Sequence, residues 1–106
     1  MVISGGANIY PIEIEACLIT MPGVRDVAVF GIPDEEFGEA LAAVIERDDD
    51  SSIDAEDVWA FVRDRLAGFK VPRIVEFEQA LPREDSGKIF KRKLRDPYWA
   101  GTGRSI

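Results

Sequence analysis

The residues best suited to chemistry in this chain are a glycine and a lysine, Gly87 and Lys88, in a polar stretch that begins at residue 81. A lysine is a compact cation on a flexible stem, so it can approach a phosphate or a carboxylate. The spacing differs from the phosphate-binding loop of nucleotide hydrolases, which needs a glycine five residues before the Gly-Lys pair and a serine or threonine after it. Those positions hold Pro82 and Ile89. Lys88 is therefore either a cation for an anionic ligand or one member of a solvated basic group.

A pair of glycines near the beginning of the chain is the second candidate. Gly5 and Gly6 separate two short extended stretches, and glycine adopts the positive φ that a tight turn requires. Because they carry no side chain, these residues also let another molecule approach the backbone closely. We therefore expect a β-hairpin with an accessible turn.

Other reactive residue types are few. The chain has no histidine and one cysteine, so zinc sites, iron–sulfur clusters and histidine-based triads lack their usual groups. Cys17 lies on the apolar stripe of an expected helix, where we expect a buried apolar role rather than a nucleophilic one. The aspartates at 48–50 lack the ligand spacing and the glycine of a calcium loop. We expect no metal site.

Length and composition fit one small globular domain. The chain has 106 residues, of which 46% are hydrophobic and 31% charged. Its longest apolar stretch, residues 27–32, is far shorter than the roughly 20 residues that a membrane helix needs. The first residues lack the pattern of a signal peptide. Together with the single cysteine, these features favour a cytoplasmic protein without an integral membrane segment.

The charge is distributed unevenly along the chain. The net charge is −7, yet residues 1–69 hold 15 acidic and 4 basic side chains, whereas residues 70–106 hold 5 acidic and 9 basic ones. An acidic body argues against general nucleic-acid binding. Residues 83–95 remain a possible basic contact for nucleic acid, but they lack interleaved aromatic residues for base stacking. The basic end is the part of the chain where an anion would be attracted.

Hydrophobic periodicity predicts a small α+β domain of two layers, with about three central strands plus the N-terminal hairpin and three flanking helices. Asp54 is the expected N-cap of the second helix, and Gly68 is the expected glycine just past its end. A flexible tail is expected at 99–106. The expected helices cover residues 11–20, 54–67 and 89–94, and the strands cover residues 24–32, 40–46 and 73–77.

Four motifs in this order and spacing resemble the C-terminal lid domain of the acyl-adenylate-forming, or AMP-binding, enzymes. This family includes acyl-CoA synthetases, the adenylation domains of peptide synthetases and luciferase. The resemblance covers residues 1–98 and is greatest to bacterial fatty-acyl-CoA ligases. The motifs occupy residues 5–15, residues 27–39, residues 69–72 and residues 81–88.

The resemblance implies a two-step reaction. A carboxylate reacts with ATP to give an acyl-adenylate and pyrophosphate, and the acyl group then passes to the thiol of coenzyme A. ATP, Mg²⁺ and the acid would bind a large N-terminal domain, while the small domain would rotate to present one face for each step. The resemblance gives Lys88 the catalytic role in adenylation, with Gly87 keeping its approach open. It places Gly5 and Gly6 along the path of the coenzyme A pantetheine.

The family's hinge residue lies just before the stretch that begins at Val2, so the hinge and the ATP-binding domain are expected to be missing here. The chain would then be inactive alone and would work with an N-terminal adenylating domain of the same polypeptide. Two other interpretations stay open. The domain could be the lid of an adenylation domain that loads a carrier protein, or a stand-alone module that docks onto a separate adenylating chain.

Overall fold

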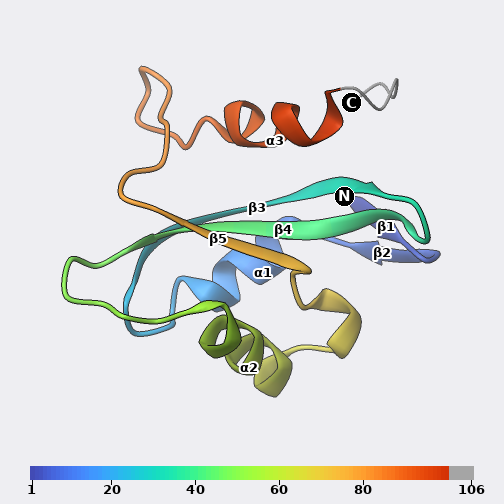
Figure 1. Ribbon diagram of the computed structural model, residues 1–106, viewed down its shortest axis with the longest axis horizontal. Helices are drawn as coiled ribbons and strands as arrows, with labels where there is room; N and C mark the ends of the chain where they lie inside the picture. The colour runs from blue at the N-terminus through green and yellow to red at the C-terminus, as the bar shows by residue number, and fades with distance from the viewer. Residues whose placement is uncertain (101–106) are drawn as a thin grey trace.

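Residues 1–100 are the part of the chain that the computed structural model describes, and they form helices packed on a sheet. Figure 1 shows the arrangement of these elements. In chain order the elements are β1 (Val2–Ser4), β2 (Ala7–Ile9), α1 (Pro11–Leu18), β3 (Val24–Asp34), β4 (Gly38–Arg47), α2 (Ala55–Arg65), the 3₁₀ turn η1 (Gly68–Lys70), β5 (Ile74–Glu78) and α3 (Lys91–Trp99).

Strand β4 lies at the centre of the sheet. It pairs antiparallel with β3 from Gly38 opposite Asp34 to Arg47 opposite Val24. It also pairs parallel with β5 and, through Gly38, antiparallel with Ser4 of β1. The hairpin of β1 and β2 therefore extends the same sheet. The predicted α+β class, with a hairpin and three further strands, is confirmed.

Helices α1 and α2 cover one face of the sheet. In α2, the Asp54 side chain accepts the Asp57 N–H at 2.9 Å, and the Asp57 side chain accepts the Asp54 N–H at 3.0 Å. This reciprocal capping box confirms Asp54 as the N-cap. The apolar residues of each helix recur at helical spacing, so they form one side, and this side packs on the sheet. The fully buried residues of the two helices are Ile14, Leu18, Val58 and Val62.

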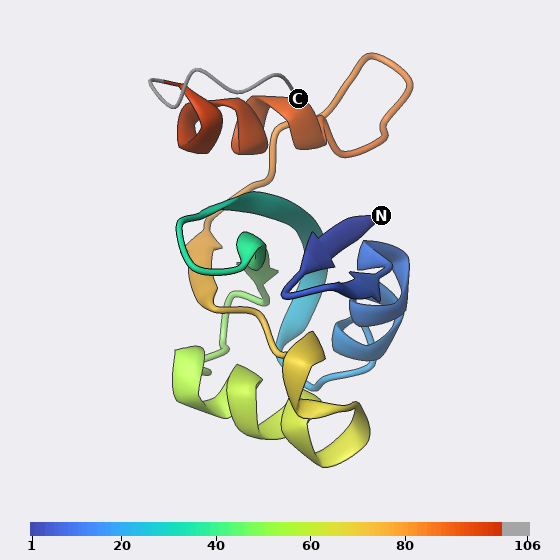
Figure 2. The ribbon, with the colours of Figure 1, turned by 90° about the vertical axis from the view of Figure 1, so that its right-hand side faces the viewer.

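Helix α3 covers the opposite face, as Figures 1 and 2 show from two directions. Helices thus lie on both sides of the sheet, which differs from the two-layer arrangement expected from the sequence. The signal for this was present in β3 and β4, whose central residues are almost all apolar instead of alternating with polar ones. The second core comprises Phe30, Ile32, Ala40, Ala42, Val44 and Leu81, with Ile74, Ile89, Leu94 and Tyr98 packed against it.

The helix ends differ from the predictions. Helix α1 ends at Leu18, and α2 ends at Arg65 with an extended C-cap residue, Leu66. Gly68 has no positive φ and begins η1, so its predicted role as the glycine that ends α2 is wrong. Helix α3 begins at Lys91 and continues to Trp99, which is buried and belongs to the fold rather than to a tail. Residues 101–106 of the expected tail lie outside the described residues.

Cys17 is half-buried, not fully buried as predicted. Burial nevertheless raises the pKa of this thiol.

None of the helices within residues 1–100 combines the length and the apolar character needed to cross a bilayer.

Candidate functional site

Lys88 lies in a tight hairpin between β5 and α3. Arg83 pairs with Ile89 across the hairpin. The Gly87 N–H donates to the Glu84 carbonyl oxygen at 2.9 Å, and the Glu84 N–H donates to the Lys88 carbonyl oxygen at 2.8 Å. With Gly87 at φ +91°, this is the pattern of a turn followed by a glycine bulge. The backbone of Lys88 is thus held while its side chain is exposed.

Gly87 has a conformational role that the spacing alone did not reveal. A Cβ atom added here would meet no other atom of the described chain within 4 Å, so space within the domain does not require glycine. The positive φ at this position does require glycine, since other residues adopt it only with strain. The glycine therefore shapes the turn that presents Lys88.

A shallow groove of about 510 Å³ lies between this hairpin and α1. Lys88, Arg83 and Lys91 are the cations that line it. Arg83 pairs with Asp26 at 2.6 Å, and Lys91 pairs with Glu15 at 2.9 Å. Lys88, in contrast, makes no ion pair within residues 1–100. Its charge is therefore available to a ligand that comes from outside the domain.

The glycine pair forms the turn between β1 and β2. Gly5 and Gly6 have φ values of +57° and +85°, as the two central residues of a type I′ turn require. The Gly5 N–H donates to the Phe37 carbonyl oxygen at 3.0 Å, so this amide is already engaged and is not offered to a ligand. A Cβ atom on Gly5 would lie 3.2 Å from the Phe37 ring, whereas one on Gly6 would meet nothing within 4 Å. Gly6 is the more accessible of the two.

A second groove, of about 410 Å³, begins at this turn. Its walls include Gly5, the exposed rings of Phe37 and Phe69, and the guanidinium of Arg73. It therefore combines apolar walls with one cation. This composition suits a narrow, partly apolar chain.

Asp34 organises one side of the second groove. Its carboxylate accepts the N–H groups of Glu36 and Phe37 at 2.9 Å each and pairs with Arg73 at 2.7 Å. The backbone hydrogen bond from Phe37, followed by that from Glu36 and the charge of Arg73, lowers the pKa of this carboxyl group. Sequence reasoning gave Asp34 and Arg73 no role. The sequence signal for Asp34 was its position directly after Pro33, in an expected turn.

The two candidate regions lie far apart on the domain. In Figure 1 the Lys88 hairpin is the orange loop beside α3, and the glycine turn is at the opposite end of the sheet, where β1 meets β2. The groove beside Lys88 and the groove beside Gly5 share no lining residue. The chain is thus a small α+β domain whose two candidate regions lie at separate ends.

Comparison with known proteins identifies the family. The model of the family described as "AMP-binding enzyme C-terminal domain" matches residues 13–88. The chain belongs to this family. It is 45% identical over 100 residues to a long-chain-fatty-acid–CoA ligase of Mycobacterium tuberculosis, covering 94% of this chain and 20% of the relative. It is 50% identical over 95 residues to a feruloyl-CoA synthase of Amycolatopsis, covering 90% and 19%.

The solved structures agree with this assignment. ATP-bound MatB from Rhodopseudomonas palustris has a TM-score of 0.87 and 44% identity, covering 92% of this chain and 19% of that one. This chain thus spans about a fifth of the length of the relatives that it matches. The family resemblance found in the sequence is confirmed.

Proposed function

We propose that this chain is the mobile C-terminal domain of an ATP-dependent acyl-CoA ligase, which converts a carboxylate to an acyl-adenylate and then to a thioester of coenzyme A. The named relatives, which include a long-chain-fatty-acid–CoA ligase and a feruloyl-CoA synthase, support this reaction class. The observation that carries the proposal is the placement of an unpaired lysine and an accessible glycine turn at opposite ends of one domain.

Lys88 is assigned to the adenylation step. In that step a carboxylate anion approaches a phosphate that is already negatively charged, and a fixed cation offsets the repulsion as charge develops on phosphorus. Lys88 meets the physical requirements because its backbone is held in a closed turn and its ammonium group has no partner within residues 1–100. Mg²⁺ and most ATP contacts are assigned to the N-terminal domain.

The glycine turn is assigned to thioester formation. The pantetheine arm of coenzyme A is narrow, and the groove beside Gly5 has apolar walls with Arg73 at its edge. Gly6 would provide a surface without a side chain along this path. In such a ligase the domain presents the Lys88 end for the first step and the glycine turn for the second.

The decisive experiment measures the two half-reactions separately in a full-length ligase in which this chain supplies the C-terminal domain. Lys88→Ala should lower ATP–pyrophosphate exchange about 10²–10³-fold, the usual effect of removing one preorganised charge. Thioester formation from a preformed acyl-adenylate should remain near the unsubstituted rate. Lys93→Ala is the matched control because Lys93 is an exposed cation on α3.

Other results would reject the assignment or select a different function. Pyrophosphate exchange within a few-fold of the unsubstituted enzyme after Lys88→Ala would overturn the catalytic role. Exchange by the 106-residue chain alone would contradict the need for an N-terminal domain. Transfer to a carrier protein, but not to coenzyme A, would identify the lid of a carrier-loading adenylation domain instead.

A further inference from the structure

Arg83 joins the Lys88 hairpin to the sheet. Its Nη2 atom lies 2.6 Å from Asp26 Oδ2 on β3 and 3.8 Å from Glu46 Oε1 on β4. Its Nη1 atom donates to the carbonyl oxygen of Gly87 at 3.2 Å. Gly87 immediately precedes Lys88 in the chain. One guanidinium group therefore connects two strands to the residue next to the proposed catalytic lysine.

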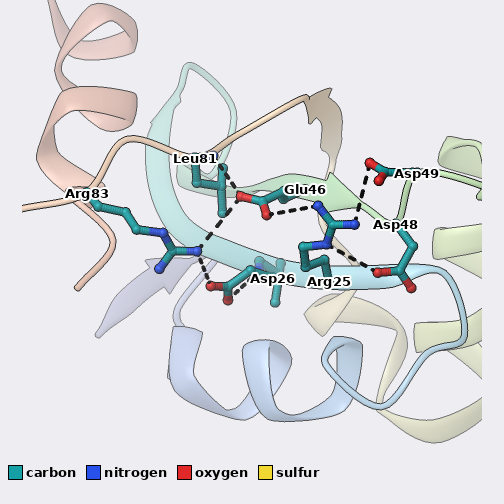
Figure 3. A network of polar contacts seen from close by, with 8 residues as sticks. Arg25, Asp26, Glu46, Asp48, Asp49, Leu81 and Arg83 are labelled. Carbon is teal, nitrogen blue, oxygen red and sulfur yellow. Dashed lines mark hydrogen bonds and ion pairs between the residues drawn. The ribbon is translucent and has the colours of Figure 1, made fainter. Parts of the chain in front are cut away.

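The partners of Arg83 are themselves fixed. Asp26 accepts the N–H of Val27 through its other oxygen at 2.9 Å. Glu46 is buried, with 7% of its surface exposed, and accepts the N–H of Leu81 at 2.9 Å. A buried carboxylate needs such compensation, so its position is closely determined. Figure 3 shows this network, in which Arg25 joins Glu46 to Asp48 and Asp49.

The backbone of the hairpin is joined to the sheet at its base, where the Leu81 N–H donates to Glu46. Further backbone hydrogen bonds of the hairpin run between its two arms, as from the Phe90 N–H to the Pro82 carbonyl oxygen at 2.7 Å. They close the turn but do not direct it relative to β3 and β4. The side-chain contact with Asp26 also raises the pKa of Arg83, consistent with a close charged hydrogen bond.

We propose that Arg83 is a positioning residue for adenylation, which holds the Lys88 hairpin in its working orientation through Asp26, Glu46 and the Gly87 carbonyl. This inference rests on the proposed function, because it acts through Lys88. The forked shape of the guanidinium group is essential, since it reaches an acid and a carbonyl at once. A lysine at this position keeps the charge but cannot reproduce the fork.

The test combines Arg83 and Lys88 substitutions in the full-length ligase. Arg83→Ala and Arg83→Lys should each lower pyrophosphate exchange about 10- to 100-fold, because a small misplacement of a catalytic group has effects of this size. Thioester formation from a preformed acyl-adenylate should change less than threefold. In a Lys88→Ala background, Arg83→Ala should have almost no further effect on exchange. Arg63→Ala, which removes an exposed arginine of α2 outside this network, is the control and should leave both steps unchanged.

A second measurement does not depend on activity. In the 106-residue chain, the backbone amide order parameters of Gly87 and Lys88 should fall from rigid values of about 0.85 to below about 0.6 in Arg83→Lys. The amides of Val44 and Ile45 in β4 should stay rigid, which shows that the sheet remains folded. Unchanged order parameters at Gly87 and Lys88 would overturn the inference.

The outcomes separate this inference from the proposed function. If Lys88→Ala slows exchange but Arg83→Ala changes it less than twofold, the positioning role fails and the function stands. If Arg83→Ala reduces exchange by its full factor in the Lys88→Ala background, Arg83 does not act through Lys88 and the inference also fails. If Lys88→Ala leaves exchange unchanged, the proposed function and this inference are both overturned.

Discussion

The indole N–H of Trp99 donates a 3.0 Å hydrogen bond to the carbonyl oxygen of Gly31, which joins the last turn of α3 to the middle of β3. Trp99 is only 8% exposed. A Cβ atom on Gly31 would lie 2.6 Å from a Glu39 oxygen and 2.9 Å from Val2, so both of these side chains would have to shift. The hydrogen bond between Trp99 and Gly31 holds α3 against the second face of the sheet.

Replacing Trp99 with alanine should therefore destabilise the domain strongly. The substitution removes a large buried ring, and losses of this kind are about 3–5 kcal/mol in the free energy of unfolding. Urea denaturation of the 106-residue chain measures the change. Tyr10→Ala is the control, since that ring is 52% exposed and should change stability by less than about 0.5 kcal/mol. A loss below about 1 kcal/mol for Trp99→Ala would show that α3 does not stabilise the fold.

The two turn glycines allow a crossed test of the two functional ends. Gly6 and Gly87 have φ values of +85° and +91°, and a Cβ atom on either meets nothing within 4 Å. Leucine at either position should therefore introduce similar backbone strain, on the order of 1–3 kcal/mol. In the full-length ligase, Gly6→Leu should slow thioester formation more than adenylation, and Gly87→Leu should do the reverse. Equal losses in both half-reactions for both variants would indicate general unfolding.

Asp34 should make stability depend on pH. Its pKa is lowered in the folded domain, so its stabilising contribution is present above its ordinary value of 3.8 and is lost as the pH falls through the folded value. Asp34→Asn should thus be less stable than the unsubstituted chain at pH 7, and the difference should shrink as the pH falls below about 4. Urea denaturation at a series of pH values checks this. A difference that stays constant or grows toward low pH would contradict the assigned contacts.

Cys17 should react slowly with thiol reagents in the folded domain. Burial is the largest influence on this thiol and raises its pKa, so less of the reactive thiolate is present at pH 8. Because the chain has one cysteine, alkylation by iodoacetamide reports on this residue alone. The rate should rise severalfold when the chain is unfolded in guanidinium chloride. Equal rates in the two states would show that Cys17 is effectively exposed.

Local sequence was sufficient for the turns, the capped helix and the strands. The paired glycines predicted the β1–β2 turn because only glycine adopts two successive positive φ values readily, and Asp54 predicted the start of α2 because its side chain satisfies a free helix N–H. The motif order also identified the family. Gly68 misled the helix prediction, because a glycine after an apolar stripe ends a helix only when it adopts a positive φ.

The tertiary structure alone determined how distant segments meet. It placed α3 on the second face of the sheet, joined Arg83 to Asp26 across 57 residues of sequence, and joined Asp34 to Arg73 across 39. It also placed Lys88 and the glycine turn at opposite ends of the domain. A turn or a cap depends on residues within four positions of one another, so the sequence displays it directly. An ion pair between distant strands and loops depends on sheet order and register, which arise only when the whole apolar core packs.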